Sequence, residues 1–169
     1  MTDAMKGLAI RPAAISDAES IAGIYNYYVT DTIVTFEEEP VSSSEIAQRM
    51  EEVRSASLPW LVAEHGGRVV GYAYASKWKA RSGYRFSTEI SVYLDAGQGG
   101  RGIGSTLYVE LFSILRGLGI RNVVGGIGLP NEASVALHEK FGMTKVAHFP
   151  AIGIKFGRWI DVGYWQGTL

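Results

Sequence analysis

The sequence contains no cysteine, and this absence removes several classes of chemistry. Without a thiol the chain forms no disulfide, offers no thiolate to a metal and has no cysteine nucleophile. Histidine is scarce as well, because the chain has three, His65, His138 and His148, and no two of them have metal-ligand spacing. We therefore expect no metal site.

The sequence also lacks an excess of charge and a long hydrophobic run. Sixteen basic residues balance 17 acidic ones, so we expect neither a nucleic-acid partner nor a polybasic contact with a membrane. The first residues, MTDAMKGLAI, do not contain the apolar core of a signal peptide, and no apolar run reaches membrane-spanning length. The expectation is a soluble, cytoplasmic protein whose partner is a small molecule.

Two S-x-x-E capping boxes predict where the first helices begin. Ser16 and Glu19 precede a helix expected over residues 17–30, and Ser42 and Glu45 precede IAQRMEEVRSA. Two further helices are expected later, over STLYVELFSILRGLG and NEASVALHEKFGM.

The remaining apolar segments are typical of strands. PWLVAEH and RVVGYAYASKW flank Gly66–Gly67 as a hairpin, and RFSTEISVYL follows as a third strand in succession. LAIRPA, NVVGGIGL and two segments near the C-terminus complete the set. Consecutive strands favour antiparallel pairing and a strand–helix–strand unit favours parallel pairing. We expect an α/β fold, a mixed central sheet of about seven strands flanked by about four helices, in one domain over residues 1–169.

The stretch GGRGIGSTL, Gly99–Leu107, has four glycines in its first six positions, between an expected strand and an expected helix. GQGGRG matches the dinucleotide fingerprint G-x-G-x-x-G, but IRNVV, about 20 residues on, offers no acid for a ribose. A P-loop is disfavoured because no lysine follows the glycines. Successive backbone N–H groups at a helix start can instead cradle a diphosphate. A tight turn without a ligand is the alternative.

A resemblance to a known family emerges from these segments. GRGIGSTL after VYL resembles the acetyl-CoA signature of the GNAT acetyltransferases, [RQ]-x-x-G-x-[GA]. More specifically, a series of segments resembles, in order and spacing, the phosphinothricin N-acetyltransferases and their methionine sulfoximine-acetylating relatives. Over about residues 8–167 these segments are TIVTFEEEP, PWLVAE, GYAYASKWKAR, TEISVYL, GSTLY, IGLPN, LHE and GIKFGRWIDVGYWQ.

The resemblance implies a GNAT fold, acetyl-CoA as co-substrate, and transfer of its acetyl group to the α-amine of a small amino-acid analogue. Phosphinothricin and methionine sulfoximine are the examples, and resistance to the first as a herbicide would follow. The chain departs from the signature at Gly99, which has no side chain where the family has Arg or Gln. Gln98, Arg101 or the backbone alone would have to take over that contact.

Two residues are candidates for catalysis, Glu89 and His138. Apolar neighbours such as Ile90 and Val92 would raise the pKa of Glu89 by desolvation and make it a base for the ammonium proton, directly or through water. The resemblance places the general base here, whereas a plain strand glutamate would face solvent. It also places His138 where many GNAT enzymes have a tyrosine thought to protonate the leaving thiolate. An imidazole suits an acid or a proton relay, and a packed structural histidine is the alternative.

The resemblance also implies the residues that bind acetyl-CoA. The backbone of Val92, Tyr93 and Leu94 would pair with the pantetheine amides, and an N–H there would polarise the thioester carbonyl. Asn131, expected as a helix N-cap, would contact the pantetheine arm. The diphosphate would lie on Gly100, Arg101, Gly102, Ile103, Gly104 and Ser105.

The acceptor would meet the segment KWKAR and several aromatic residues. The resemblance assigns Lys79 and Arg81 to the amino-acid substrate, and the arginine fork suits a carboxylate or phosphinate. Phe36 and Tyr84 would wall the pocket beside Glu89, or belong to the core. The aromatic end FGRWIDVGYWQ matches the part through which the family forms homodimers, although a plain core strand would have the same composition.

We therefore expect an acetyl-CoA-dependent N-acetyltransferase that works by direct attack of the amine. With no cysteine, no cysteine acyl-enzyme can form. Acetylation of another small amine or amino acid is one alternative, and a non-catalytic acyl-CoA-binding module is the other.

Overall fold

The computed structural model describes residues 7–169 of the chain. Its strands are β1 (Leu8–Pro12), β2 (Trp60–His65), β3 (Arg68–Lys77), β4 (Ser87–Leu94), β5 (Asn122–Leu129), β6 (Thr144–Lys155) and β7 (Arg158–Thr168). Its helices are α1 (Ala18–Asp31), α2 (Ser43–Ser55), α3 (Ile103–Gly117) and α4 (Glu132–Lys140), with 3₁₀ turns η2 (Ile15–Asp17) and η3 (Ser82–Tyr84). No helix within residues 7–169 is long and apolar enough to cross a membrane.

The strands form one seven-stranded sheet in the order β1-β2-β3-β4-β5-β7-β6. Neighbouring strands pair antiparallel, with one exception. β4 and β5, which α3 connects along the chain, pair parallel. The predicted mixed α/β sheet is thus confirmed, with the element order expected from the sequence.

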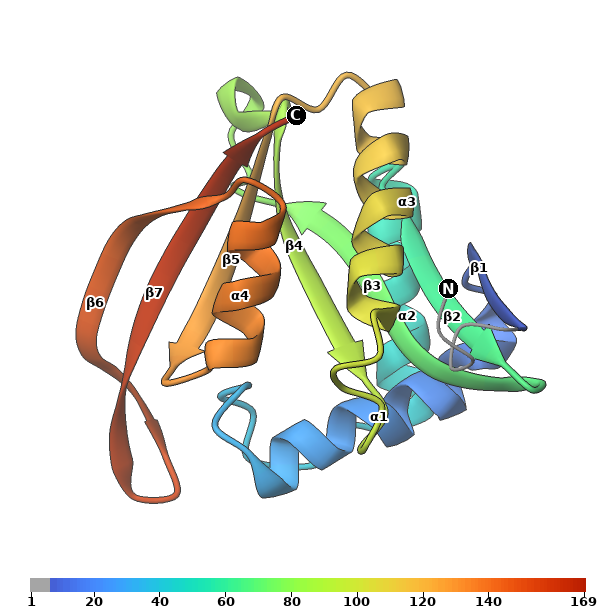
Figure 1. Ribbon diagram of the computed structural model, residues 1–169, viewed down its shortest axis with the longest axis horizontal. Helices are drawn as coiled ribbons and strands as arrows, with labels where there is room; N and C mark the ends of the chain where they lie inside the picture. Colours follow the sequence, from blue (N-terminus) through green and yellow to red (C-terminus); the bar gives the residue numbers. More distant parts are fainter. Residues whose placement is uncertain (1–6) are drawn as a thin grey trace.

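The two faces of the sheet carry different helices (Figure 1). On one face, Leu107 and Leu111 of α3 are fully buried against small residues such as Ala73, and α4 packs beside α3. On the other face, α1 and α2 pack against Val62 and Tyr72. Side chains alternate along each strand, so successive residues of β4 and β5 belong to different faces.

The start of α1 differs from the prediction. The helix begins and ends within one residue of its predicted bounds. The predicted Ser16–Glu19 capping box is wrong, because Ser16 lies inside the 3₁₀ turn η2 that directly precedes the helix. Asp17 takes the polar role instead. Its carboxylate accepts the Ala14 N–H at 2.8 Å and pairs with Arg11 of the preceding strand, β1, at 2.7 Å.

At α2 the prediction is confirmed, since Ser42 Oγ accepts the Glu45 N–H at 3.2 Å and the Glu45 carboxylate accepts the Ser42 N–H at 2.8 Å.

The parallel pairing of β4 and β5 is short. It links Ser87, Thr88 and Glu89 to residues 122–124 and then stops, although both strands continue. Figure 1 shows the two strands spreading apart beyond this point. From Ile90 to Leu94, β4 pairs only with β3, so no strand within residues 7–169 pairs with its other edge, and the Tyr28 hydroxyl contacts the backbone of Leu94.

Candidate active site

A narrow cavity of about 50 Å³ lies in the gap between the diverging strands. It is lined from β4, β5, α3 and α4, and the residue at its start, Ile90, directly follows the last β4–β5 pair. Its lining consists of Val34, Ile90, Ser91, Val92, Tyr93, Tyr108, Gly126, Ile127, Gly128, Asn131, Ser134 and His138.

A wider pocket of about 710 Å³ opens beside the narrow cavity, on the side of the connection between α1 and α2. The two hollows share Val34, Tyr93, Gly126 and Gly128, so they adjoin each other at the gap. Glu89 lines the wider pocket. A small molecule there would lie next to a carboxylate, and an elongated molecule could reach it through the gap from the α3–α4 side.

Glu89 is a half-buried carboxylate at the last position of β4 that pairs with β5. Desolvation raises its pKa, and the positive charge of Lys79 partly opposes that shift. A Cβ placed on Gly126 of β5 would lie 3.5 Å from Glu89 Oε1 and 3.1 Å from a ring carbon of Tyr164. The absent side chain therefore leaves room mainly for the Tyr164 ring, and a Cβ there would be in ordinary contact with the carboxylate. Its raised pKa makes Glu89 a stronger proton acceptor than an exposed glutamate.

His138 lies on the other side of β5, 4% exposed. Its Nδ1 is 2.7 Å from the Ser134 carbonyl oxygen, so Nδ1–H donates there and Nε2 is the bare nitrogen. The Tyr108 hydroxyl lies 3.1 Å from Nε2 and donates to it. Burial lowers the pKa of His138 and raises that of Tyr108. The pair is therefore a neutral imidazole and a neutral phenol.

Gly125 leaves room for the imidazole of His138. A Cβ on Gly125 would lie 2.6 Å from His138 Cδ2, closer than carbon atoms approach. Because neighbouring strand residues point to opposite faces, the two glycines open the sheet on its two sides.

The start of α3 is built from backbone alone. Gly102, its N-cap, has a φ of 84° and Gly100 a φ of 72°, and no side chain caps the helix. The first N–H groups of a helix have no intrahelical partner, and they carry the positive end of the helix dipole. Lys140 of α4 adds a cation here, donating to Ser105 Oγ at 2.9 Å. Together these groups form a site suited to an anion such as a diphosphate.

Residues 10–163 match the family model described as the acetyltransferase (GNAT) domain. The chain belongs to the GNAT acetyltransferase family.

Relatives of this GNAT protein are similar over almost its whole length. It is 40% identical to a phosphinothricin N-acetyltransferase of Streptomyces viridochromogenes, over 98% of this chain and 90% of the relative. It is 35% identical to an L-methionine sulfoximine/L-methionine sulfone acetyltransferase of Salmonella typhimurium, over 94% and 93%. A crystal structure of a GNAT superfamily phosphinothricin acetyltransferase from Sinorhizobium meliloti in complex with AcCoA superposes with a TM-score of 0.92, at 37% identity over 96% of this chain and 89% of that one.

The GNAT fold brings most of the expected site residues to the gap and to the start of α3. Glu89 and His138 flank the gap, and Val92, Tyr93 and Asn131 line it. Leu94 lies at the end of β4, where its carbonyl accepts the Tyr28 hydroxyl at 2.6 Å. The predicted N-cap is confirmed, since Asn131 Oδ1 accepts the Ser134 N–H at 3.1 Å. The expected diphosphate residues, Gly100, Arg101, Gly102, Ile103, Gly104 and Ser105, are contiguous at the start of α3.

The expected acceptor residues of this GNAT protein divide between two hollows. Phe36 shares the wider pocket with Glu89. Lys79, Arg81 and Tyr84 line a separate hollow of about 340 Å³ near the end of α2. β3 ends before Lys79, so the strand alternation that would carry these side chains onward stops there. Lys79 remains near enough for its charge to act on Glu89. The substrate role of these three residues stays a prediction.

Sequence reasoning missed several residues of the GNAT site. Tyr108 and Tyr164 are buried or half-buried aromatics whose sequence context resembles any core position. The pair Gly125–Gly126 in the middle of a strand was a usable signal, because glycine there often marks a close approach of other groups.

Proposed function

We propose that this GNAT acetyltransferase transfers the acetyl group of acetyl-CoA to the α-amine of a small amino-acid analogue of the phosphinothricin or methionine sulfoximine type. The observation that carries the proposal is the position of Glu89, a half-buried carboxylate of raised pKa where the β4–β5 pairing ends and the acceptor pocket opens. The names of the two curated relatives support the substrate class. We take residues 1–169 as one catalytic domain, in keeping with the single sheet and the family match over residues 10–163.

Acetyl-CoA supplies the thioester from which the acetyl group is transferred, and the residues present fit it. The bare N–H groups from Ile103 to Ser105, with Lys140 nearby, would hold the diphosphate. The open edge of β4 would hydrogen-bond the pantetheine amides as a neighbouring strand does. An N–H of the same edge would polarise the thioester carbonyl. Asn131, on the wall of the gap, would contact the pantetheine arm.

Glu89 acts as the general base in this proposal. An amino acid arrives with its amine protonated, and the lone pair is free only after that proton leaves. The raised pKa of Glu89 brings the carboxyl closer to the amine in proton affinity, which favours the transfer directly or through one water. The amine then attacks the thioester without an enzyme-bound acetyl group.

His138 acts as a proton relay in this proposal. Because the pKa of His138 is lowered, Nε2 is unprotonated near neutral pH, and the imidazole has no proton of its own to give to the thiolate. Once the Tyr108 hydroxyl turns away, Nε2 can take the second proton that the nitrogen loses as the amide forms, and return it to the departing sulfur. The hydrogen bond from Nδ1 to Ser134 holds the tautomer that this relay needs.

The wider pocket suits a short acceptor with an apolar middle. Phe36 and Tyr164 offer aromatic walls, and Lys79 and Arg81 lie on the neighbouring surface as partners for a carboxylate or phosphinate. Acetylation of phosphinothricin would remove its ammonium charge, and the chain would then act as a resistance enzyme for that herbicide.

We further propose a homodimer through the β6–β7 hairpin. β6 is an edge strand, and its apolar side chains Val146, Ile152 and Ile154 are each about half exposed or more. Phe156 in the turn after β6 is also about half exposed, and Trp159 of β7 is 67% exposed. Apolar groups gathered on a sheet edge are typical of an association surface. A second copy of the chain would cover them by two-fold symmetry.

A panel of free amino acids and analogues, with thiol release measured for each, tests the function. Turnover with phosphinothricin or methionine sulfoximine above all other acceptors is the expected result. Turnover confined to an unrelated amine would contradict the substrate class. Tight acetyl-CoA binding without thiol release from any acceptor would indicate an acyl-CoA-binding module instead.

A further inference from the structure

The acceptor pocket is closed on one side by the connection between α1 and α2, residues 32–42, which forms neither helix nor strand. This connection supplies Val34, Thr35, Phe36 and Glu38 to the pocket wall. An irregular segment keeps one shape only where other groups hold its backbone. The contacts that hold this connection therefore determine the shape of the acceptor pocket.

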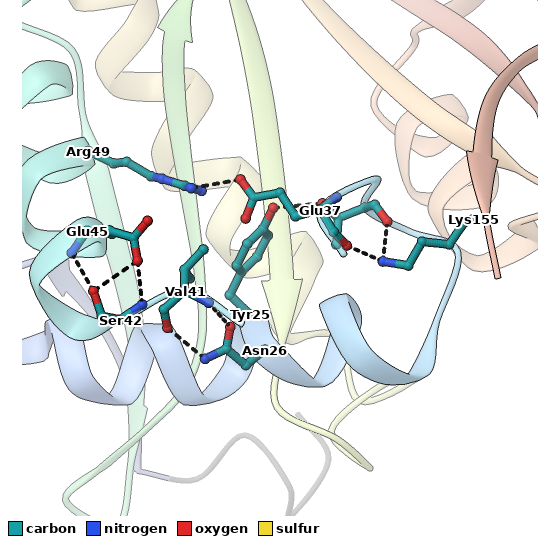
Figure 2. Close-up of polar contacts among 9 residues, drawn as sticks. Tyr25, Asn26, Glu37, Val41, Ser42, Glu45, Arg49 and Lys155 are labelled. Atoms are coloured by element: carbon teal, nitrogen blue, oxygen red, sulfur yellow. Dashed lines mark hydrogen bonds and ion pairs between the residues drawn. The ribbon is translucent and has the colours of Figure 1, made fainter. Parts of the chain in front are cut away.

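Helix α1 holds the connection at two places, Thr35 and Val41 (Figure 2). The Tyr25 hydroxyl lies 2.7 Å from Thr35 Oγ1. The side-chain amide of Asn26 makes both backbone hydrogen bonds of Val41, donating to its carbonyl at 2.9 Å and accepting its N–H at 2.8 Å. These contacts leave the middle of the connection, around Phe36, to be held by other elements.

The middle is held from two opposite sides. Arg49 of α2 pairs with the Glu37 carboxylate at 2.7 Å, and Lys155 of β6 reaches the same segment from the far side, as Figure 2 shows. Lys155 Nζ donates to the Thr35 carbonyl at 3.0 Å and also to the Glu37 carbonyl. These carbonyls belong to the residues on either side of Phe36, so one ammonium fixes the backbone on both sides of that ring.

Lys155 is an unusual residue to find at this place. It is 1% exposed, and within residues 7–169 the acceptors of its hydrogen bonds are these two main-chain carbonyls. Burying an ammonium is costly unless hydrogen bonds compensate it. Desolvation accordingly lowers the pKa of Lys155, while the carboxylates of Glu38 and Glu37 oppose the shift. An apolar side chain would fill the same space at lower cost, which indicates that the two carbonyl contacts are what the lysine provides.

The same strand also fixes the ring of Phe36. Gly153 lies two residues before Lys155 on β6, and a Cβ placed on it would lie 2.7 Å from Phe36 Cζ. The ring therefore rests on bare backbone. β6 thus contacts this segment in two ways: Gly153 packs against the Phe36 ring, and Lys155 binds the carbonyls of the residues on either side of Phe36.

We propose that Lys155 is a positioning residue for the acetyl acceptor, holding residues 35–37 against β6 and so setting the place of Phe36 and Glu38 in the pocket. The proposal rests on the proposed acetyl transfer. Lys155 acts through the backbone it binds, while the start of α3 and the open edge of β4 are built without it. Loss of the ammonium should therefore weaken acceptor binding and leave acetyl-CoA binding as it was.

The test compares Lys155→Met with Lys145→Met, the same substitution at an exposed position of the same strand. With L-methionine sulfoximine as the probe, we expect Lys155→Met to raise the KM for the acceptor about ten-fold or more, because a small displacement of a positioning wall has effects of that size. The KM for acetyl-CoA should change by less than about two-fold, and Lys145→Met should change neither KM, because the Lys145 ammonium hydrogen-bonds His148 and not residues 35–37.

Hydrogen exchange provides a second readout that does not depend on turnover. The amides of residues 36–38 should exchange about ten-fold faster in Lys155→Met than in the wild type or in Lys145→Met. Unchanged exchange, or an equal rise of both KM values, would overturn the proposal. An inactive wild type with faster exchange in the variant would instead overturn the acetyl transfer alone. Should Lys155→Met fail to fold, Gly153→Ala displaces Phe36 directly and is expected to raise the acceptor KM alone.

Discussion

Glu89 and His138 approach the gap between β4 and β5 from opposite faces of the sheet. The two side chains face successive glycines of β5: a Cβ on Gly125 would overlap the imidazole, and a Cβ on Gly126 would lie in ordinary contact with Glu89 Oε1, 3.5 Å away. In the proposed reaction, the base for the incoming amine and the proton relay for the departing thiol therefore act from opposite faces of the sheet.

The first prediction concerns Glu89→Gln. The amide has nearly the same shape and cannot take the ammonium proton, so we expect kcat to fall about 10²–10⁴-fold. Titration calorimetry should find the affinity for acetyl-CoA unchanged. Glu110→Gln, an exposed position of α3, is the matched control and should keep full activity. Full turnover of Glu89→Gln at every pH would remove Glu89 from the chemistry.

The second prediction concerns stability in the same variant. Because folding raises the pKa of Glu89, the native state holds this proton more tightly than the unfolded chain. The free energy of unfolding therefore falls as the pH rises from the unfolded pKa through the native one, and it stays lower above it. Glu89→Gln removes this pH-dependent fall in the free energy of unfolding, because the amide does not titrate.

Its Tm should exceed that of the wild type at about pH 7.5, and the difference should shrink toward about pH 3.5, where both side chains are neutral. Differential scanning fluorimetry at the two pH values makes the comparison. A variant less stable than the wild type at the higher pH would contradict the raised pKa.

The third prediction concerns Gly125→Ala. The added methyl group would overlap the imidazole of His138, so that ring must move away from Tyr108 and the gap. We expect a loss of about 1–3 kcal/mol in the free energy of unfolding. We also expect kcat to fall at least about ten-fold. Gly23→Ala, in open space on α1, is the control and should gain up to about 1 kcal/mol from helix propensity.

The fourth prediction separates two glycines of the loop before α3. Gly102 has a φ of 84°, a left-handed conformation that costs alanine about 1–2 kcal/mol, so Gly102→Ala should distort the anion site. The Kd for acetyl-CoA should rise about ten-fold, equivalent to roughly 1.4 kcal/mol. Gly99→Ala has open space and no such strain, and its Kd should stay unchanged. Equal effects of the two substitutions on Kd would contradict this account of the loop.

The fifth prediction concerns assembly. Light scattering after gel filtration should give the wild type a mass of about twice 18.4 kDa. Trp159→Glu places a charge on the exposed apolar hairpin and should shift the mass toward that of one chain. Ile15→Glu, an equally simple change at an exposed apolar residue of η2, should leave the mass as it was. A wild type with the mass of one chain would contradict the homodimer.

Local sequence signals were sufficient wherever the deciding groups lie within a few residues of one another. The Gly66–Gly67 hairpin is present, with φ angles of 58° and 77°. The Ser42 capping box and the Asn131 cap are present too. The Ser16 capping box failed because Asp17 pairs with Arg11, a residue of another element.

The sequence by itself determined the element order, the glycine-built start of α3 and the family to which the chain belongs, because helix periodicity, turn chemistry and motif spacing act over short stretches of chain. Only the tertiary structure decided where β4 leaves β5, which faces Glu89 and His138 occupy, and that Lys155 reaches the carbonyls around Phe36 across 120 residues of chain. Those relationships depend on the packing of distant elements, and no short stretch of the sequence encodes them.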